Sequence, residues 1–132
     1  MGLIMNKENF FQYVKDFNEG DYRQFILSYF TEDAIFENPE VRYEGRENII
    51  SYFIKSHKGV NEVLRVKNIL IDGNRIAAEL EAELQVTADR PDHHIRPVKN
   101  GDTLLLTISA FYDLKDSKIC HIRIYRKKLT LL

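Results

Sequence analysis

The sequence feature that most constrains the fold is a change in the spacing of apolar residues at about Val60. Before this point apolar residues recur every three or four positions, as in helices, and after it they alternate with polar residues, as in strands. Asp72-Gly73-Asn74 is typical of a tight hairpin turn. Parallel strands need a crossover connection, usually a helix, and no helical pattern separates the later strands. The sequence therefore predicts an α+β fold with helices first and a mostly antiparallel sheet after them.

Three helices are expected in the first half of the chain. Asn6 and Asp21 are residue types that cap helix N-termini, and each precedes a segment with apolar residues at helical spacing. A third helix is predicted from about Arg46 to His57. Between the second and third helices, residues 34–38 and 41–43 are expected to be extended.

The second half of the chain is expected to form two long hairpins. The predicted strands are residues 63–71, 76–86, 104–114 and 118–127. Residues 87–101, which contain Pro91, Pro97 and several charges, are expected to form a long loop between the hairpins. Such loops in compact domains are often mobile or lie beside a binding site.

Alternation in the predicted strand 76–86 indicates how the sheet faces are used. Leu80 and Leu84 point to one face, with Ala78 and Ala82, while glutamates at 79, 81 and 83 point to the other. In the last strand, His121 and Arg123 are expected to pair across the sheet with this acidic stripe. The alternative is that the polar face is a subunit interface.

Length and composition limit the class of protein. With 132 residues, 44% of them hydrophobic, residues 1–132 are expected to form a single domain. Nineteen basic and twenty acidic residues give a net charge of -1, which argues against a nucleic-acid partner. No apolar run is long enough to span a membrane, and the single cysteine, Cys120, does not indicate an oxidising compartment. A cytoplasmic protein with no membrane partner is predicted.

The segment Tyr29–Pro39, followed by Gly45-Arg46-Glu47 at the start of the third helix, resembles the nuclear transport factor 2-like superfamily. The SnoaL-like and ketosteroid-isomerase-like branches are the most similar, and the resemblance extends from about Asn6 to Lys128. It implies a cone-shaped α+β barrel in which a strongly curved, mostly antiparallel sheet wraps three N-terminal helices. It also implies an apolar cavity inside the cone and a homodimer formed through the outer sheet face.

The resemblance assigns two candidate catalytic residues. Tyr13 matches the tyrosine that donates a hydrogen bond to the oxyanion in ketosteroid isomerases, and Asn38 matches the aspartate that is their general base. An amide cannot accept a proton from carbon at neutral pH, so that mechanism is not expected here. Ile108 stands where the second oxyanion donor belongs, and phenylalanines at positions 30 and 53 replace two supporting tyrosines.

The inner face of the predicted sheet and helices supplies candidate ligand-binding residues. Tyr112 and Arg126 are its polar members, and Arg126 has the fork geometry to hold a carboxylate or an enolate, or could instead extend to solvent. The full predicted set is Phe17, Phe36, Phe53, Leu80, Leu106, Ile108, Tyr112, Ile122 and Arg126.

His93-His94 is the cluster whose composition most resembles that of a metal site. Adjacent residues in an extended chain point to opposite sides, and no second cluster supplies further ligands. We therefore expect a solvated loop at this point, with no metal and no cofactor.

Three functions remain open from the sequence. The first is a SnoaL-like protein that binds a small apolar molecule in the cone cavity, with its chemistry undecided. The second is an isomerase, cyclase or dehydratase acting on an apolar carbonyl compound, with Tyr13 as hydrogen-bond donor and Asn38 as polariser. The third is a non-catalytic dimeric interaction module.

Overall fold

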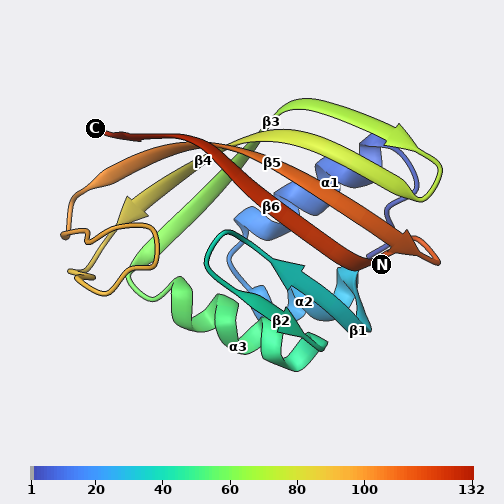
Figure 1. Cartoon of the computed structure of the whole chain (residues 1–132), viewed down its shortest axis with the longest axis horizontal. Coiled ribbons are helices and arrows are strands. Elements are labelled where there is room, and N and C mark those ends of the chain that lie inside the picture. The colour runs from blue at the N-terminus through green and yellow to red at the C-terminus, as the bar shows by residue number, and fades with distance from the viewer. Residues whose placement is uncertain (1) are drawn as a thin grey trace.

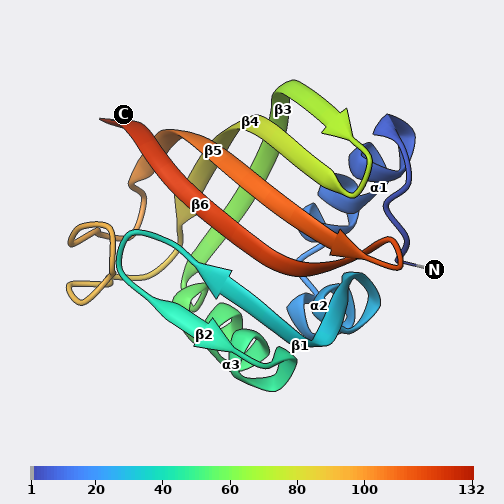
Figure 2. The same ribbon diagram turned by 45° about the vertical axis from the view of Figure 1, so that its right-hand side comes forward.

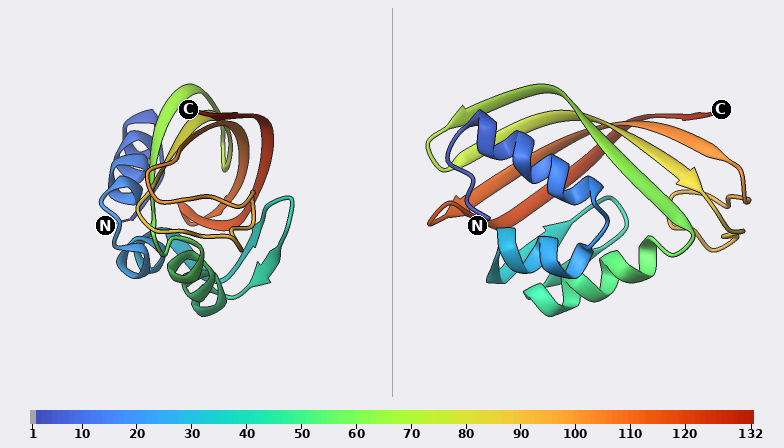
Figure 3. Two further views of the ribbon diagram at one scale, coloured as in Figure 1. Left: turned by 90° about the vertical axis from the view of Figure 1, so that its left-hand side faces the viewer. Right: turned by 180° about the vertical axis from the view of Figure 1, so that it is seen from behind.

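Three helices lie against the concave side of one strongly curved sheet (Figure 1; Figure 3). The computed structural model describes residues 2–132. The helices are α1 (Lys7–Asn18), α2 (Tyr22–Tyr29) and α3 (Arg46–Ser56). The strands are β1 (Phe30–Glu37), β2 (Arg42–Glu44), β3 (Val60–Asp72), β4 (Arg75–Val86), β5 (Thr103–Lys115) and β6 (Lys118–Leu131).

The six strands have the order β2-β1-β6-β5-β4-β3, and all neighbours are antiparallel except β1 and β6 (Figure 2). The predicted α+β fold, with three N-terminal helices in a curved and mostly antiparallel sheet, is therefore confirmed. Strands β2 and β3 are the two edges of the sheet, so the cone is an open sheet and not a closed barrel.

The predicted helix starts agree with the capping bonds. The Asn6 side chain accepts a hydrogen bond from the backbone N–H of Asn9 at 2.8 Å, and that of Asp21 accepts one from Gln24 at 3.2 Å. Within residues 2–132, no helix is long and apolar enough to cross a membrane.

Strand β1 starts at Phe30, directly after α2, and not at Ala34 as predicted. Phe30 is fully buried and pairs with Ile119 of β6, and the register then shifts before Ile35. The polar run at residues 31–33 lies in this irregular stretch. It interrupts the apolar alternation by which a strand is recognised in the sequence.

Strand β4 alternates as expected, with buried residues at every second position from Ile76 to Val86. Its outward glutamates Glu81 and Glu83 pair with Arg65 of β3 at 3.0 and 2.7 Å. The predicted pairing of this acidic stripe with the basic residues of β6 is wrong, because β5 lies between β4 and β6.

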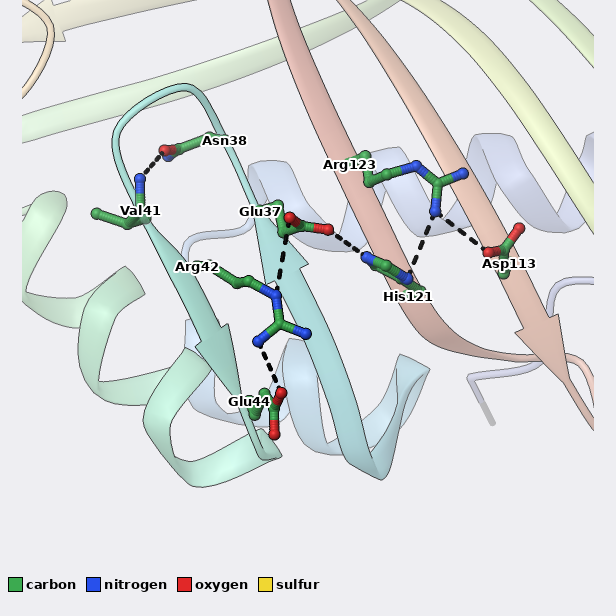
Figure 4. A network of polar contacts seen from close by, with 8 residues as sticks. All are labelled: Glu37, Asn38, Val41, Arg42, Glu44, Asp113, His121 and Arg123. Carbon is green, nitrogen blue, oxygen red and sulfur yellow. Dashed lines mark hydrogen bonds and ion pairs between the residues drawn. The ribbon is translucent and has the colours of Figure 1, made fainter.

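A chain of polar contacts crosses the outer face from β2 to β5 (Figure 4). It runs through Glu44, Arg42, Glu37, His121, Arg123 and Asp113. His121 and Arg123 face outward here, while Ile122 between them faces the interior. Partly exposed pairs of this kind contribute about 0–1 kcal/mol each. Their main structural effect is to join the short β1–β2 hairpin to the rest of the sheet.

Asn18, the last residue of α1, attaches this helix to the edge strand β3. Its Nδ2 donates to the carbonyl oxygen of Leu64 at 3.0 Å, and its Oδ1 accepts from the Leu64 N–H at 2.8 Å. An edge strand has backbone groups without a strand partner. Asn18 satisfies two of these groups and holds α1 across the concave face.

Replacing this asparagine should therefore destabilise the fold. We expect Asn18→Ala to lower the free energy of unfolding by about 1–3 kcal/mol, because both Leu64 backbone groups lose a partner in a part-buried setting. Urea denaturation followed by circular dichroism measures this difference. Asn61→Ala is the matched control, since Asn61 is exposed, its side chain bonds to that of Gln85, and its loss should change stability by at most about 0.5 kcal/mol. Equal effects of the two substitutions would contradict this role for Asn18.

Candidate functional site

A cavity of about 100 Å³ lies between the helices and the concave face of the sheet. The structure brings together on its wall all the residues that the sequence identified as candidate catalytic or ligand-binding residues. They are Tyr13, Phe17, Phe36, Asn38, Phe53, Leu80, Leu106, Ile108, Tyr112, Ile122 and Arg126. The alternation in β4, β5 and β6 and the helical spacing in α1 and α3 place these side chains inward.

Two tyrosines form what we call the buried end of the cavity, Tyr13 of α1 and Tyr112 of β5. Their side chains are almost fully buried and their rings meet edge to face, with centroids 5.8 Å apart. Burial, followed by the influence of Tyr112, raises the pKa of Tyr13, and burial also raises the pKa of Tyr112. Both hydroxyls therefore keep their protons at neutral pH and can act as hydrogen-bond donors.

Asn38 lines the cavity, but its amide also shapes the turn between β1 and β2. Its Oδ1 accepts from the backbone N–H groups of Glu40 and Val41, both at 2.9 Å. Figure 4 shows the contact with Val41. Its Nδ2 donates to the hydroxyl of Tyr52 at 2.9 Å. This bond uses one of the two N–H groups of the amide, so polarising a ligand carbonyl would fall to the other.

Arg126 is held by Glu40 from the same turn. The two guanidinium nitrogens Nη1 and Nη2 each donate to one carboxylate oxygen of Glu40, with Nη1 at 2.6 Å from Oε2. These hydrogen bonds lower the pKa of Glu40. Arg126 therefore neither extends freely to solvent nor offers a free fork to a ligand anion, which would have to displace Glu40.

A carboxylate on the cavity wall, Glu62 of β3, was missed by the sequence analysis. Its Oε1 lies 2.8 Å from His57 Nε2, and the other ring nitrogen of His57 lies 2.8 Å from the carbonyl oxygen of Phe53. Both ring nitrogens of His57 therefore face oxygen atoms. The signal was present in the sequence, since Glu62 alternates with inward-facing Val60 and Leu64, but the predicted strand began only at residue 63.

His93 and His94 also line the cavity, and the expectation of a solvated loop is wrong. His93 is only 7% exposed, and the two rings lie against each other with centroids 4.4 Å apart. The chain is bent here and not extended, because residues 90 and 98 are bridged and the Ile95 N–H donates to His93 Nδ1 at 3.3 Å. This bend turns both rings to the same side.

Burial keeps both of these imidazoles neutral. It lowers the pKa of His93 from 6.5 to about 4, with a smaller contribution from the neighbouring His94. Burial, followed by the charge of Arg126, also lowers the pKa of His94. Among residues 2–132, no three His, Cys, Asp or Glu side chains are grouped so as to hold a metal ion.

The comparisons with known proteins agree with this architecture. A crystal structure of a candidate polyketide cyclase from Xanthomonas campestris is similar with a TM-score of 0.76 and 25% identity, covering 87% of this chain and 84% of that one. A second candidate polyketide cyclase, from Pseudomonas putida, has a TM-score of 0.69 and 28% identity, covering 87% and 86%. An epoxide hydrolase from M. tuberculosis shares the fold at 14% identity, with a TM-score of 0.68 and coverage of 87% and 77%.

A search of curated proteins found no match. The model of the SnoaL-like domain family matches residues 10–122, which is most of the chain. Together with the curved sheet and the three helices, this match establishes that the chain belongs to the SnoaL-like domain family.

Proposed function

We propose that this protein binds a small apolar carbonyl compound in its cavity and transfers a proton at the carbon next to the carbonyl. The observation that carries the proposal is the Glu62 carboxylate on the wall of a mostly apolar cavity that also contains the hydroxyls of Tyr13 and Tyr112. Two candidate polyketide cyclases are among the similar structures, which supports a carbonyl substrate.

Glu62 supplies the base that Asn38 cannot provide. Its Oε1 is engaged by His57, and among the described residues its second oxygen has no hydrogen-bond partner. The carboxylate and Tyr13 line the same cavity. A ligand between them can therefore meet a base on one side and a hydroxyl donor on the other.

The proposed step moves one proton and one electron pair. Glu62 removes a proton from the α-carbon, and the electrons of the broken C–H bond form a C=C bond while the carbonyl oxygen becomes an oxyanion. The hydroxyl of Tyr13 or Tyr112 donates to this oxyanion in a setting from which water is largely excluded. Return of the proton to the same or to another carbon completes an exchange or an isomerisation.

Ligand binding without chemistry is the second candidate function. The specific observation in its favour is that Glu62 is already bonded to His57, as expected for a structural pair in a partly buried setting. In that case the cavity binds the same kind of molecule, and Glu62 serves only to position His57 at the end of α3.

We also propose that the protein forms a homodimer through the outer face of the sheet. Leu70, Ala77, Phe111 and Arg123 form one row across β3, β4, β5 and β6 on this face. Leu70 and Phe111 are 68% and 41% exposed, and Tyr125 beside Phe111 is 54% exposed. Apolar side chains gathered on one exposed face are typical of an interface.

Removing the proposed base should abolish proton transfer but not binding. In D₂O, the wild-type protein should accelerate deuterium exchange at the α-carbons of cyclohexanone, and Glu62→Gln should reduce this acceleration by about 10²-fold or more. ¹H NMR of the ketone measures the rate, and methyl shifts of Ile108 and Ile122 report binding. Glu79→Gln, on the exposed outer face, is the matched control and should accelerate exchange of the ketone as much as the wild type does.

The outcomes separate the two candidate functions. Binding with no acceleration by the wild-type protein would favour the non-catalytic function. Acceleration that survives in Glu62→Gln would show that another group is the base.

The neutral state of His93 predicts a loss of stability in acid. The unfolded chain takes up a proton at this residue near pH 6.5, whereas the folded protein does so only near pH 4, so acidification through this window favours unfolding. Between pH 6.5 and 4.5 we expect the free energy of unfolding of the wild type to fall by about 2 kcal/mol more than that of His93→Asn. The asparagine is chosen because its amide oxygen can still accept from the Ile95 N–H. Urea denaturation at a series of pH values measures this. Titration of the His93 ring near pH 6.5 in the folded protein would contradict it.

A charge in the exposed row should prevent the proposed homodimer. Sedimentation should show a dimer for the wild-type protein and a monomer for Phe111→Lys, because the lysine would be buried without a partner in the interface. Ile54→Lys is the control, since Ile54 is similarly exposed at 44% but lies on α3. A wild-type monomer, or a Phe111→Lys dimer of equal affinity, would refute this interface.

A further inference from the structure

The cavity is small for a ligand site. Its volume is about 100 Å³, whereas an apolar cavity of about 150 Å³ is known to hold one benzene molecule. The enclosed part of a ligand is therefore limited to about the size of a single six-membered ring. A molecule with two or more fused rings exceeds this space.

The ring of Phe53 is one of the side chains that set this limit. It lies 5.2 Å from the ring of Phe36 and 6.4 Å from that of Phe17, measured between centroids, so three aromatic rings from three elements meet at one point. Phe53 is also in contact with the rings of Tyr52 and His57 on its own helix. These neighbours hold it in place, and it is only 7% exposed. Aromatic packing of this kind leaves little freedom to enlarge the cavity.

The charged groups on the wall are already paired. Arg126 is bonded to Glu40 and Glu62 to His57, while His93 and His94 are kept neutral by burial. A carboxylate entering the cavity would lose its hydration without gaining a free cationic partner. Uncharged polar ligands can still use the hydroxyls of Tyr13 and Tyr112.

We infer that the ligand is a carbonyl compound without an anionic group and no larger than one six-membered ring with a short substituent. This inference rests on the proposed function, because it assumes that the cavity is the binding site. It narrows the substrate class by two independent features, the Phe53 cluster for size and the Arg126–Glu40 pair for charge. The carbonyl oxygen is expected at the buried end, near Tyr13 and Tyr112.

The size limit is tested with ketones of increasing ring number. Cyclohexanone, 1-decalone and the four-ring ketone 5α-androstan-17-one are titrated into the wild-type protein, and binding is followed by the NMR methyl shifts of Ile108 and Ile122. Without a size limit, affinity should rise roughly fourfold for each added buried methylene. We expect the reverse order, with cyclohexanone binding at least tenfold more tightly than 1-decalone and no binding of the four-ring ketone.

A charge test uses two molecules of nearly equal shape. Methyl cyclohexyl ketone should bind, and cyclohexanecarboxylate should bind at least tenfold more weakly at pH 7. Carboxylate binding of equal strength would overturn the inference about charge. It would show that Arg126 exchanges Glu40 for the ligand.

Variants of Phe53 test the cause of the size limit. Phe53→Ala should bind 1-decalone at least tenfold more tightly than the wild type does, because most of one ring is removed from the cavity. Phe53→Leu is a milder variant for the case in which alanine prevents folding, and it should shift the preference in the same direction. Phe11→Ala is the matched control, since Phe11 lies on α1 but is 50% exposed. This variant should bind the three ketones in the same order of affinity as the wild type.

The results separate a failure of this inference from a failure of the proposed function. If the larger ketones bind to the wild type as tightly as cyclohexanone, the size inference is wrong and the cavity remains a ligand site. If no ketone of any size shifts the Ile108 and Ile122 methyl signals in the wild type, the cavity is not a ligand site, and both proposals fail.

Discussion

The mismatch between long strands and short helices is the constraint on which the rest of this structure depends. Strands β3 to β6 have 12 to 14 residues, so each is about 40 Å or more long, whereas the 12 residues of α1 extend only about 18 Å. The inner face of the sheet is apolar and has to be covered, but three short helices cannot cover all of it. The sheet curves instead, and the space left between α1, α3 and the sheet is the cavity. The loop at residues 87–102 and the β1–β2 turn contribute to the part of its wall that the helices do not reach.

The cavity wall is formed by helices in one part and by loops and strand ends in another, and this explains why polar residues gather on one part of it. Where helices face the sheet, apolar and aromatic side chains meet, and the buried end keeps only the hydroxyls of Tyr13 and Tyr112. Where loops and strand ends complete the wall, the backbone groups of the turns need hydrogen-bond partners, and charged residues pair with other polar residues. Asn38 closes its turn, Glu40 binds Arg126, and His57 bonds to both Phe53 and Glu62. These polar groups complete the cavity wall, and they are also the polar groups that a bound ligand would contact.

Much of the fold and of the cavity wall could be predicted from the sequence, because both depend on local periodicity. Inward residues such as Leu80, Leu106 and Ile122 follow from alternation within a strand, and Phe17 and Phe53 follow from helical spacing. The polar partners could not be predicted in this way. Arg126 and Glu40 are 86 residues apart in the chain, and their meeting depends on the parallel pairing of β1 with β6. The positions of His93 and His94 depend on the bend between residues 90 and 98, for which the sequence has no periodic signal.

The side chain of residue 38 supports the turn between β1 and β2. An aspartate at this position could also accept hydrogen bonds from the N–H groups of Glu40 and Val41, so the turn alone does not require an asparagine. The amide donates to the Tyr52 hydroxyl and so joins the turn to α3, whereas a carboxylate could keep this contact only by accepting from the hydroxyl. A carboxylate at position 38 would also stand close in sequence to Glu40, whose charge is needed for Arg126. The amide therefore fits a wall in which the acid is Glu62, on another strand, and in which the turn that includes Asn38 has become part of the support for the cavity.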